Sequence, residues 1–158
     1  MKGSVILCES NPRGKFMEGT VSGTPSPGTL MSVVAATEPV GGRHTWEPYN
    51  RSANGEQALV AVLLEPFHGT SYNTAYVTGE RCRLYFPLPG EELNMLVSAA
   101  GTGTGDGIAI GDLLIPVDGT GLLIATANTP EMEPFQSLET QTDVTAAGTL
   151  TWCMYTGH

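Results

Sequence analysis

The stretch from Gly105 to Ala127, GDGIAIGDLLIPVDGTGLLIATA, carries Asp106, Asp112 and Asp118 at a six-residue spacing. Hard cations such as Ca²⁺ bind several carboxylate and carbonyl oxygens held in one flexible loop. Here apolar segments separate the aspartates, and neither an EF-hand loop nor a nonapeptide calcium repeat is present. An Asp side chain can instead accept hydrogen bonds from the N–H groups of its own turn. We therefore expect three turns and no metal, with Asp112 and Asp118 as weak metal candidates.

The same stretch lacks the features of a phosphate-binding loop. Its glycines do not follow the G-x-G-x-x-G spacing, no Gly-Lys-Ser/Thr follows, and it contains no Lys or Arg. Catalytic and zinc-binding patterns are also missing, because the histidines and cysteines are scattered and share no ligand or triad spacing. We expect no enzyme activity and no cofactor. The residues considered were His44, His68, His158, Cys8, Cys82 and Cys153.

The charge of the chain is unevenly placed. The formal net charge is −9, and after Arg83 nine acidic residues follow without any Lys or Arg. Residues 1–18 carry three basic and two acidic side chains, a net charge of +1, which leaves −10 for the rest. Affinity for nucleic acid depends on Lys and Arg at the phosphates, so we expect no nucleic-acid partner. No window reaches the ~18 apolar residues of a membrane helix, and we expect no membrane partner.

The elements that would position these residues are short strands. With 20 glycines and 11 prolines, the chain is punctuated by turns. The run ALVAVLLEPF has strand length and predicts a strand buried on both faces. The segment NTPEMEPFQSLETQTD is the only helix-like one, residues 38–57 form a long polar loop, and no internal repeat is apparent. The predicted strands lie near residues 4–8, 29–36, 58–67, 83–86, 113–117, 122–127 and 149–155.

This pattern predicts an all-β fold, a single-domain β-barrel or a β-tulip-like or sandwich domain, with an extended N-terminal arm. We place the arm at residues 1–19 and the barrel-like domain at 20–158, with a C-terminal strand at 149–155. Two pairs of aromatic residues lie in polar loops, where rings often anchor partners. They are Trp46 with Tyr49 and Tyr72 with Tyr76. Burial of these rings by loops that fold back over the barrel is an equally weighted alternative.

Several segments, taken in order, resemble the head decoration proteins of tailed bacteriophages, also called capsid cement proteins. The opening SGTPSPGTLMSV is similar to the Pro-Gly opening of that family, and ALVAVLLEP is similar to its buried strand. The segments YVTGERCRLYFPLPGEEL and LVSAAGTGTGDGIAIGDLLIPVDGTGLL resemble its next two motifs, and GTLTWCMY its last strand. The resemblance spans roughly residues 20–155.

The resemblance implies a β-barrel or β-tulip-like domain that binds the major capsid protein on the outside of the head and stabilises it. It implies a homotrimer at three-fold or quasi-three-fold positions of the virion, made in the host cytoplasm, without catalytic residues. We further expect the slightly basic arm, residues 1–18, to contact the capsid, by adding a strand to an edge of a shell protein. The candidates for capsid contact are Arg13, Lys15, Phe16 and Met17.

Two other classes stay open at this point. The aromatic loops are compatible with a carbohydrate- or receptor-binding β-domain, such as a phage fibre tip. A trimeric all-β nucleotide hydrolase is the second alternative, and the absence of basic residues after Arg83 argues against it.

Overall fold

The computed structural model describes residues 13–34, 39, 41–54, 59–66, 74–99, 107–126 and 135–157. Within these residues the chain forms strands and one single-turn helix, and no described helix is long and apolar enough to span a membrane. In chain order the elements are β1 (Lys15–Val21), β2 (Leu30–Val33), β3 (Thr45–Pro48), α1 (Arg51–Asn54), β4 (Val60–Leu63), β5 (Arg81–Phe86), β6 (Glu92–Val97), β7 (Leu113–Pro116), β8 (Leu123–Ala125), β9 (Phe135–Ser137) and β10 (Thr149–Tyr155).

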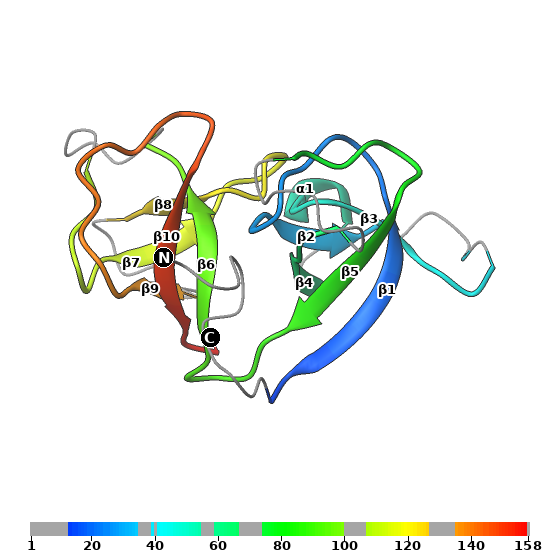
Figure 1. Ribbon diagram of the computed structural model, residues 1–158, viewed down its shortest axis with the longest axis horizontal. Coiled ribbons are helices and arrows are strands. Elements are labelled where there is room, and N and C mark those ends of the chain that lie inside the picture. The colour runs from blue at the N-terminus through cyan, green and yellow to red at the C-terminus, as the bar shows by residue number, and fades with distance from the viewer. Residues whose placement is uncertain are drawn as a thin grey trace.

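The strands close into two five-stranded barrels that lie side by side (Figure 1). The first barrel has the order β1-β3-β2-β4-β5, and the second has the order β10-β6-β8-β7-β9. The short linker between β5 and β6 passes from one barrel to the other. The predicted all-β barrel class is therefore confirmed, although the sequence pattern did not indicate that there would be two barrels.

Strand β4 shows how the two barrels share their cores. Ala61 and Leu63 are buried inside the first barrel, among residues that include Trp46. Val62, on the opposite face of the same strand, is buried in a second cluster that also fills the interior of the second barrel. The prediction of a strand buried on both faces is confirmed. The outer face of the first barrel is thus part of the core of the second, and burial of this apolar surface holds the barrels together.

The two barrels have the same topology. In each, the first strand pairs parallel with the third and antiparallel with the fifth. In each, the second strand pairs antiparallel with the third and the fourth, and the fourth with the fifth. All five pairings agree in partner and direction. The chain therefore contains one five-stranded barrel twice, a repeat of the fold that is not apparent in the amino-acid sequence.

Hydrogen bonds outside the strands repeat as well. Gly28 lies two residues before β2 with φ 88°, and Gly111 lies two residues before β7 with φ 91°. The N–H of Gly28 donates to the carbonyl of Leu63, and the N–H of Gly111 donates to the carbonyl of Ser137, each at 2.8 Å. Leu63 and Ser137 are the last residues of the fourth strand of their barrels. The turns that precede the second strands are therefore equivalent.

The repeats differ where the first strand meets the third. In the first barrel, the N–H of Thr20 donates to the carbonyl of His44 at 3.0 Å, just before β3. The equivalent N–H in the second barrel belongs to Leu96, and it donates to the carbonyl of Gly28, in the first barrel, at 3.0 Å. The first barrel therefore supplies an acceptor that the second barrel does not supply for itself.

The same segment of the first barrel also binds the turn between β7 and β8. The N–H of Leu30 donates to the carbonyl of Gly121 at 2.9 Å, and the N–H of Gly119 donates to the carbonyl of Tyr49 at 2.7 Å. Segment Gly28–Leu30 thus lies between β6 and the residues that precede β8. The turn between β7 and β8, which contains Asp118 and Gly119, is consequently part of the contact between the barrels.

The predicted strands correspond to β2, β4, β5, β7, β8 and β10, whereas the predicted strand at 4–8 lies outside the described residues. Three other elements differ from expectation. The part of the polar loop 38–57 at Thr45–Pro48 is β3, and the described end of the helix-like segment contains β9 (Phe135–Ser137). The boundary predicted at residue 19 falls inside β1, so Lys15–Gly19 form a barrel strand instead of a free arm.

Replacement of Gly121 by Ala should destabilise the protein by more than the ~1 kcal/mol cost of a left-handed alanine. Gly121 has φ 64°, and an added Cβ would meet the Leu30 carbonyl oxygen and the Thr29 side chain. Gly119→Ala is the matched control, because Gly119 lies in the same turn with φ 81° and an added Cβ would meet nothing within 4 Å. Urea denaturation measures both variants. Equal losses would contradict the close approach of the two barrels at Gly121.

Candidate docking surface

The first four residues of β1 are exposed on both faces of the strand. The side chain of Phe16 is 48% exposed and that of Met17 is 39% exposed, and the charged residues Lys15 and Glu18 flank this pair. From Gly19 onwards the strand becomes buried. An apolar pair at the exposed start of a strand is a candidate contact site, because large exposed side chains rarely cluster without a partner.

Phe16 is held in place by its neighbours on β5. Its ring lies 5.0 Å from the ring of Tyr85, and the guanidinium of Arg83 lies 5.7 Å from the centre of the Phe16 ring. Phe16 and Tyr85 are directly opposite each other in the β1–β5 ladder. The ring of Phe16 is thus an ordered, exposed apolar group beside a cation, as in a cation–π contact.

Basic residues gather around this part of the first barrel. Arg81 and Arg43 both contact the carboxylate of Glu18, the latter at 3.5 Å. The hydrogen bond from Arg81 is the main reason why the pKa of Glu18 lies below its usual value. With Arg13, Lys15 and Arg83, five of the seven basic residues of the chain lie on or beside β1 and β5. From the sequence, only Arg13 and Lys15 were recognised as part of a basic segment.

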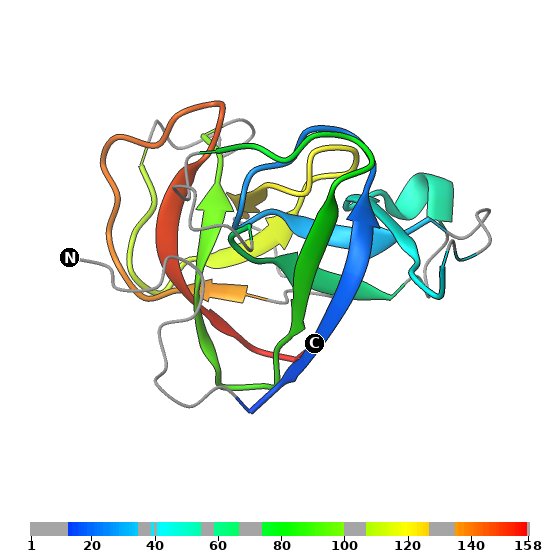
Figure 2. The ribbon, with the colours of Figure 1, turned by 45° about the vertical axis from the view of Figure 1, so that its right-hand side comes forward.

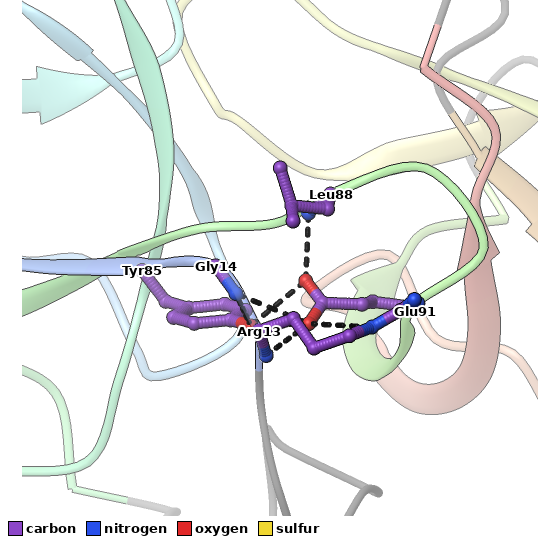
Figure 3. A network of polar contacts seen from close by, with 5 residues as sticks. All are labelled: Arg13, Gly14, Tyr85, Leu88 and Glu91. Atoms are coloured by element: carbon purple, nitrogen blue, oxygen red, sulfur yellow. Dashed lines mark hydrogen bonds and ion pairs between the residues drawn. The ribbon is translucent and has the colours of Figure 1, made fainter.

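A buried carboxylate ties the chain before β1 to the linker between the barrels (Figure 3). Glu91 is 2% exposed and precedes β6. Its carboxylate accepts hydrogen bonds from the hydroxyl of Tyr85 at 2.7 Å, from the N–H of Leu88 at 2.6 Å and from the N–H of Gly14 at 3.2 Å. The N–H and the guanidinium of Arg13 complete the set. We call Glu91 and these partners the Glu91 latch.

Burial by itself raises the pKa of Glu91, but the hydrogen bonds together outweigh burial and hold the pKa below its usual value. The charged form is therefore the one that the latch favours. No sequence motif marks this residue, because two of its donors, the N–H groups of Arg13 and Gly14, lie far away along the chain. The sequence signal is only an acidic residue after a Pro-Gly turn.

The aspartates of the Gly-Asp stretch have structural partners. The carboxylate of Asp112 accepts a hydrogen bond from the N–H of Ala109 at 2.8 Å, which confirms the turn role predicted for it. Asp118 instead binds the other barrel, because its carboxylate accepts hydrogen bonds from the N–H of Arg51 and the hydroxyl of Ser52. These bonds, led by that of Ser52, lower the pKa of Asp118. Asp106 lies outside the described residues.

The two aspartates therefore contact different segments. In the described part of the chain, no group of three or more His, Cys, Asp or Glu side chains is arranged to hold a metal ion. Burial raises the pKa of the Cys82 thiol to about 12, so it is not a thiolate at neutral pH. Cys153 is buried in the other core cluster.

Two of the four loop aromatics are core residues. Trp46 and Tyr76 are both buried in the first barrel, where Trp46 packs edge-on against Phe86 at 5.8 Å. The structure thus places these two rings away from any partner surface, because Trp46 lies on the barrel strand β3 and both rings are packed in the core cluster. Tyr49 is half-buried against the other core cluster, and Tyr72 lies outside the described residues.

A recess of about 440 Å³ lies between the barrels. Its polar lining comes from short hydroxyl side chains and one carboxylate, and its apolar lining from Pro and Leu residues, without an aromatic ring. Glu47 in this recess accepts a hydrogen bond from the amide of Asn54 at 2.9 Å. The hydroxyl residues are Ser22, Thr24, Ser26, Thr29 and Thr120.

No family model and no curated protein matches the chain. Among solved structures, the chain is similar to the head fiber gp8.5 N base of bacteriophage phi29, with 12% sequence identity and a TM-score of 0.49. The match covers 90% of this chain and 94% of the phi29 chain. Proteins so distant in sequence can share a fold without sharing a function.

Replacement of Glu91 by Gln should lower the free energy of unfolding at pH 7 by about 1–3 kcal/mol, because its buried donors lose a charged acceptor. The folded pKa of Glu91 is lowered, so its stabilisation is complete above the ordinary carboxyl value of 4.5 and is lost as pH falls through the folded pKa. The difference between wild type and variant should therefore shrink below pH 4.5.

Thermal unfolding of both proteins from pH 7 to pH 3 measures this difference. Asp143→Asn is the control for charge alone, because Asp143 is exposed and also lies in the second half of the chain. If Glu91→Gln and Asp143→Asn behave alike at every pH, the Glu91 latch does not stabilise the fold.

Proposed function

We propose that the protein is a structural component of a tailed-phage virion that binds the outer surface of the head and stabilises it. In this proposal it is not an enzyme, and its partners are the major capsid protein and two further copies of itself, at three-fold or quasi-three-fold positions. The proposal is supported by the motif resemblance across residues 20–155 and by one structural observation. That observation is the exposed start of β1, where Phe16 and Met17 lie among basic side chains.

The structure supports this surface as a contact site in a way that the sequence did not. Phe16 is already ordered by Tyr85 and Arg83, so little side-chain freedom would be lost when a partner covers it. Aromatic and Arg side chains are also the types that most often dominate binding energy. Three of the four candidates for capsid contact, Lys15–Met17, are the first residues of β1, and Arg13 lies two residues before it.

A modest surface of this kind suits a trimer. When three copies are linked, the second and third contacts become intramolecular, and the overall affinity can exceed that of one site by about 10²–10⁴-fold. The acidic second barrel, which has no Lys or Arg, would be repelled by acidic surfaces and would leave the basic side chains on β1 and β5 of the first barrel to make the contact.

The receptor-binding alternative loses part of its basis. It was motivated by four loop aromatics, and two of them, Trp46 and Tyr76, are fully buried. The recess between the barrels has no aromatic lining on which a sugar ring could stack.

The double variant Lys15→Glu and Phe16→Ala should bind undecorated heads of the cognate phage at least about tenfold more weakly than wild type, because a charge and a hot-spot ring are lost. Lys15 and Phe16 are exposed, so the fold should be kept. Co-sedimentation with heads, followed by imaging of the decorated particles, measures the occupancy.

The matched control is Ile110→Ala, which removes a side chain that is 67% exposed on the second barrel. It should bind heads as wild type does. If the double variant and wild type reach the same occupancy, the start of β1 is not the head-binding surface. If wild type itself does not bind heads, the proposed function is wrong. A deletion of residues 1–18 is a poorer test, because it removes four of the seven residues of β1.

A further inference from the structure

One edge of β1 has no strand beside it in the described part of the chain. Strand β5 pairs with Lys15–Thr20, but β3 pairs only with Thr20 and Val21. Among the described residues, Lys15–Gly19 are therefore paired on one side only, and we call the other side the open edge. In Figures 1 and 2 this half of β1 runs beside β5 at the lower end of the first barrel.

The hydrogen bonds further along β1 show which backbone groups point to the open side. The N–H groups of Thr20 and Ser22 donate toward β3, to the carbonyls of His44 and Trp46. The N–H of Val21 donates to the other side, to the carbonyl of Glu80. Since backbone N–H groups alternate between the two sides of a strand, those of Phe16 and Glu18 point to the open side. Their carbonyls point the same way.

The second barrel contains the same edge in a covered state. Counted back from the equivalent residues Ser22 and Ser98, which donate to Trp46 and Leu123 in their barrels, Glu18 corresponds to Asn94. The side chain of Glu18 is 44% exposed, whereas Asn94 is 2% exposed.

The cover of that second edge is the turn at Gly28, just before β2. The N–H of Leu96 donates to the carbonyl of Gly28, and a Cβ on Gly28 would lie 3.2 Å from the carbonyl oxygen of Asn94. A chain segment that leads into a strand therefore covers the first strand of the second barrel. The first strand of the first barrel has an open edge at the equivalent place.

We infer that the open edge of β1 is completed by an extended segment of the head-shell protein, which adds as a strand beside Lys15–Gly19 and carries acidic side chains. The inference rests on the proposed function and specifies its contact. Backbone bonds to Phe16 and Glu18 supply the pairing, as in other strand-addition complexes. Exposed Phe16 on one face and Met17 on the other flank the added strand.

The basic side chains near the open edge favour a partner segment that carries acidic side chains. Arg43 and Arg81 both pair with Glu18 at the open edge, so these two cations exceed its one carboxylate. Lys15 on β1 and Arg83 over Phe16 add positive charge, so an acidic segment is favoured. A second copy is disfavoured as the occupant, because two β1 edges would bring two basic clusters together. The corresponding edge of β6 in a second copy is already covered, since Asn94 is 2% exposed.

Replacement of Glu18 by Pro tests the inference. Proline removes the outward N–H of residue 18 but leaves the β5 ladder intact, and edge strands tolerate such a proline. Glu18→Pro should bind undecorated heads at least about tenfold more weakly than Glu18→Gln, which also lacks the carboxylate but keeps the N–H. Met17→Pro removes an N–H that points to β5 and should unfold the first barrel instead.

Hydrogen–deuterium exchange of the wild-type protein gives a readout that needs no variant. Peptides that cover residues 15–19 should exchange more slowly on heads than in the free protein. Equal head binding by Glu18→Pro and Glu18→Gln, or unchanged exchange in bound wild type, overturns strand addition while the proposed function stands. If Glu18→Pro loses self-association and keeps head binding, the occupant is a second copy and the inference is wrong. Failure of wild type to bind heads overturns both.

Discussion

The segment Gly28–Leu30 is the contact on which the arrangement of the two barrels depends. Its Gly28 carbonyl accepts the N–H of Leu96 from β6, and its Leu30 N–H donates to the carbonyl of Gly121, just before β8. The segment therefore bonds to the chain on both sides of the junction between β6 and β8. Strands β6 and β8 pair at only one position, Val97 with Leu123. The second barrel therefore obtains from the first the hydrogen bonds that the first makes within itself. Because buried backbone groups must be paired, the two barrels are best regarded as one folding unit.

A repeated barrel explains how one scaffold presents two different surfaces. Gly19 and Val21 of β1 and the inward-facing residues of β6 are buried, but the outward-facing positions of the two strands differ in exposure. In the second barrel they are covered by the first barrel, and in the first barrel they are exposed and surrounded by basic side chains. The charge of the two halves diverges in the same way, since every Lys and Arg precedes the second barrel. In a repeated barrel, the first strand of one copy can pack against the other barrel, while the first strand of the other copy stays exposed and can contact a partner.

The sequence predicted the strands whose signal is local. Strand β4 is a continuous apolar run, and β7 and β8 flank an Asp-Gly turn, so composition and turn chemistry were sufficient. Strand β3 was missed because only Trp46 marks it within a polar loop, and its burial depends on β1 and β2, which are distant in the sequence. The repeat was missed for a similar reason. Strand pairing and glycine conformation repeat, whereas side-chain identities do not.

The candidate site was predictable only in part, because the contacts that hold β1 in place come from residues far away in the sequence. The sequence indicated that the start of β1 is a basic and apolar segment. It did not indicate how this segment is attached to the rest of the protein. Six paired positions join β1 to β5, and the Glu91 latch joins the chain before β1 to the linker between the barrels. A force applied to β1 would therefore be distributed between the sheet of the first barrel and the linker between the two barrels. A docking strand fixed at one end by a buried carboxylate and along one edge by a ladder is pre-organised, and pre-organisation reduces the entropy lost when a partner binds.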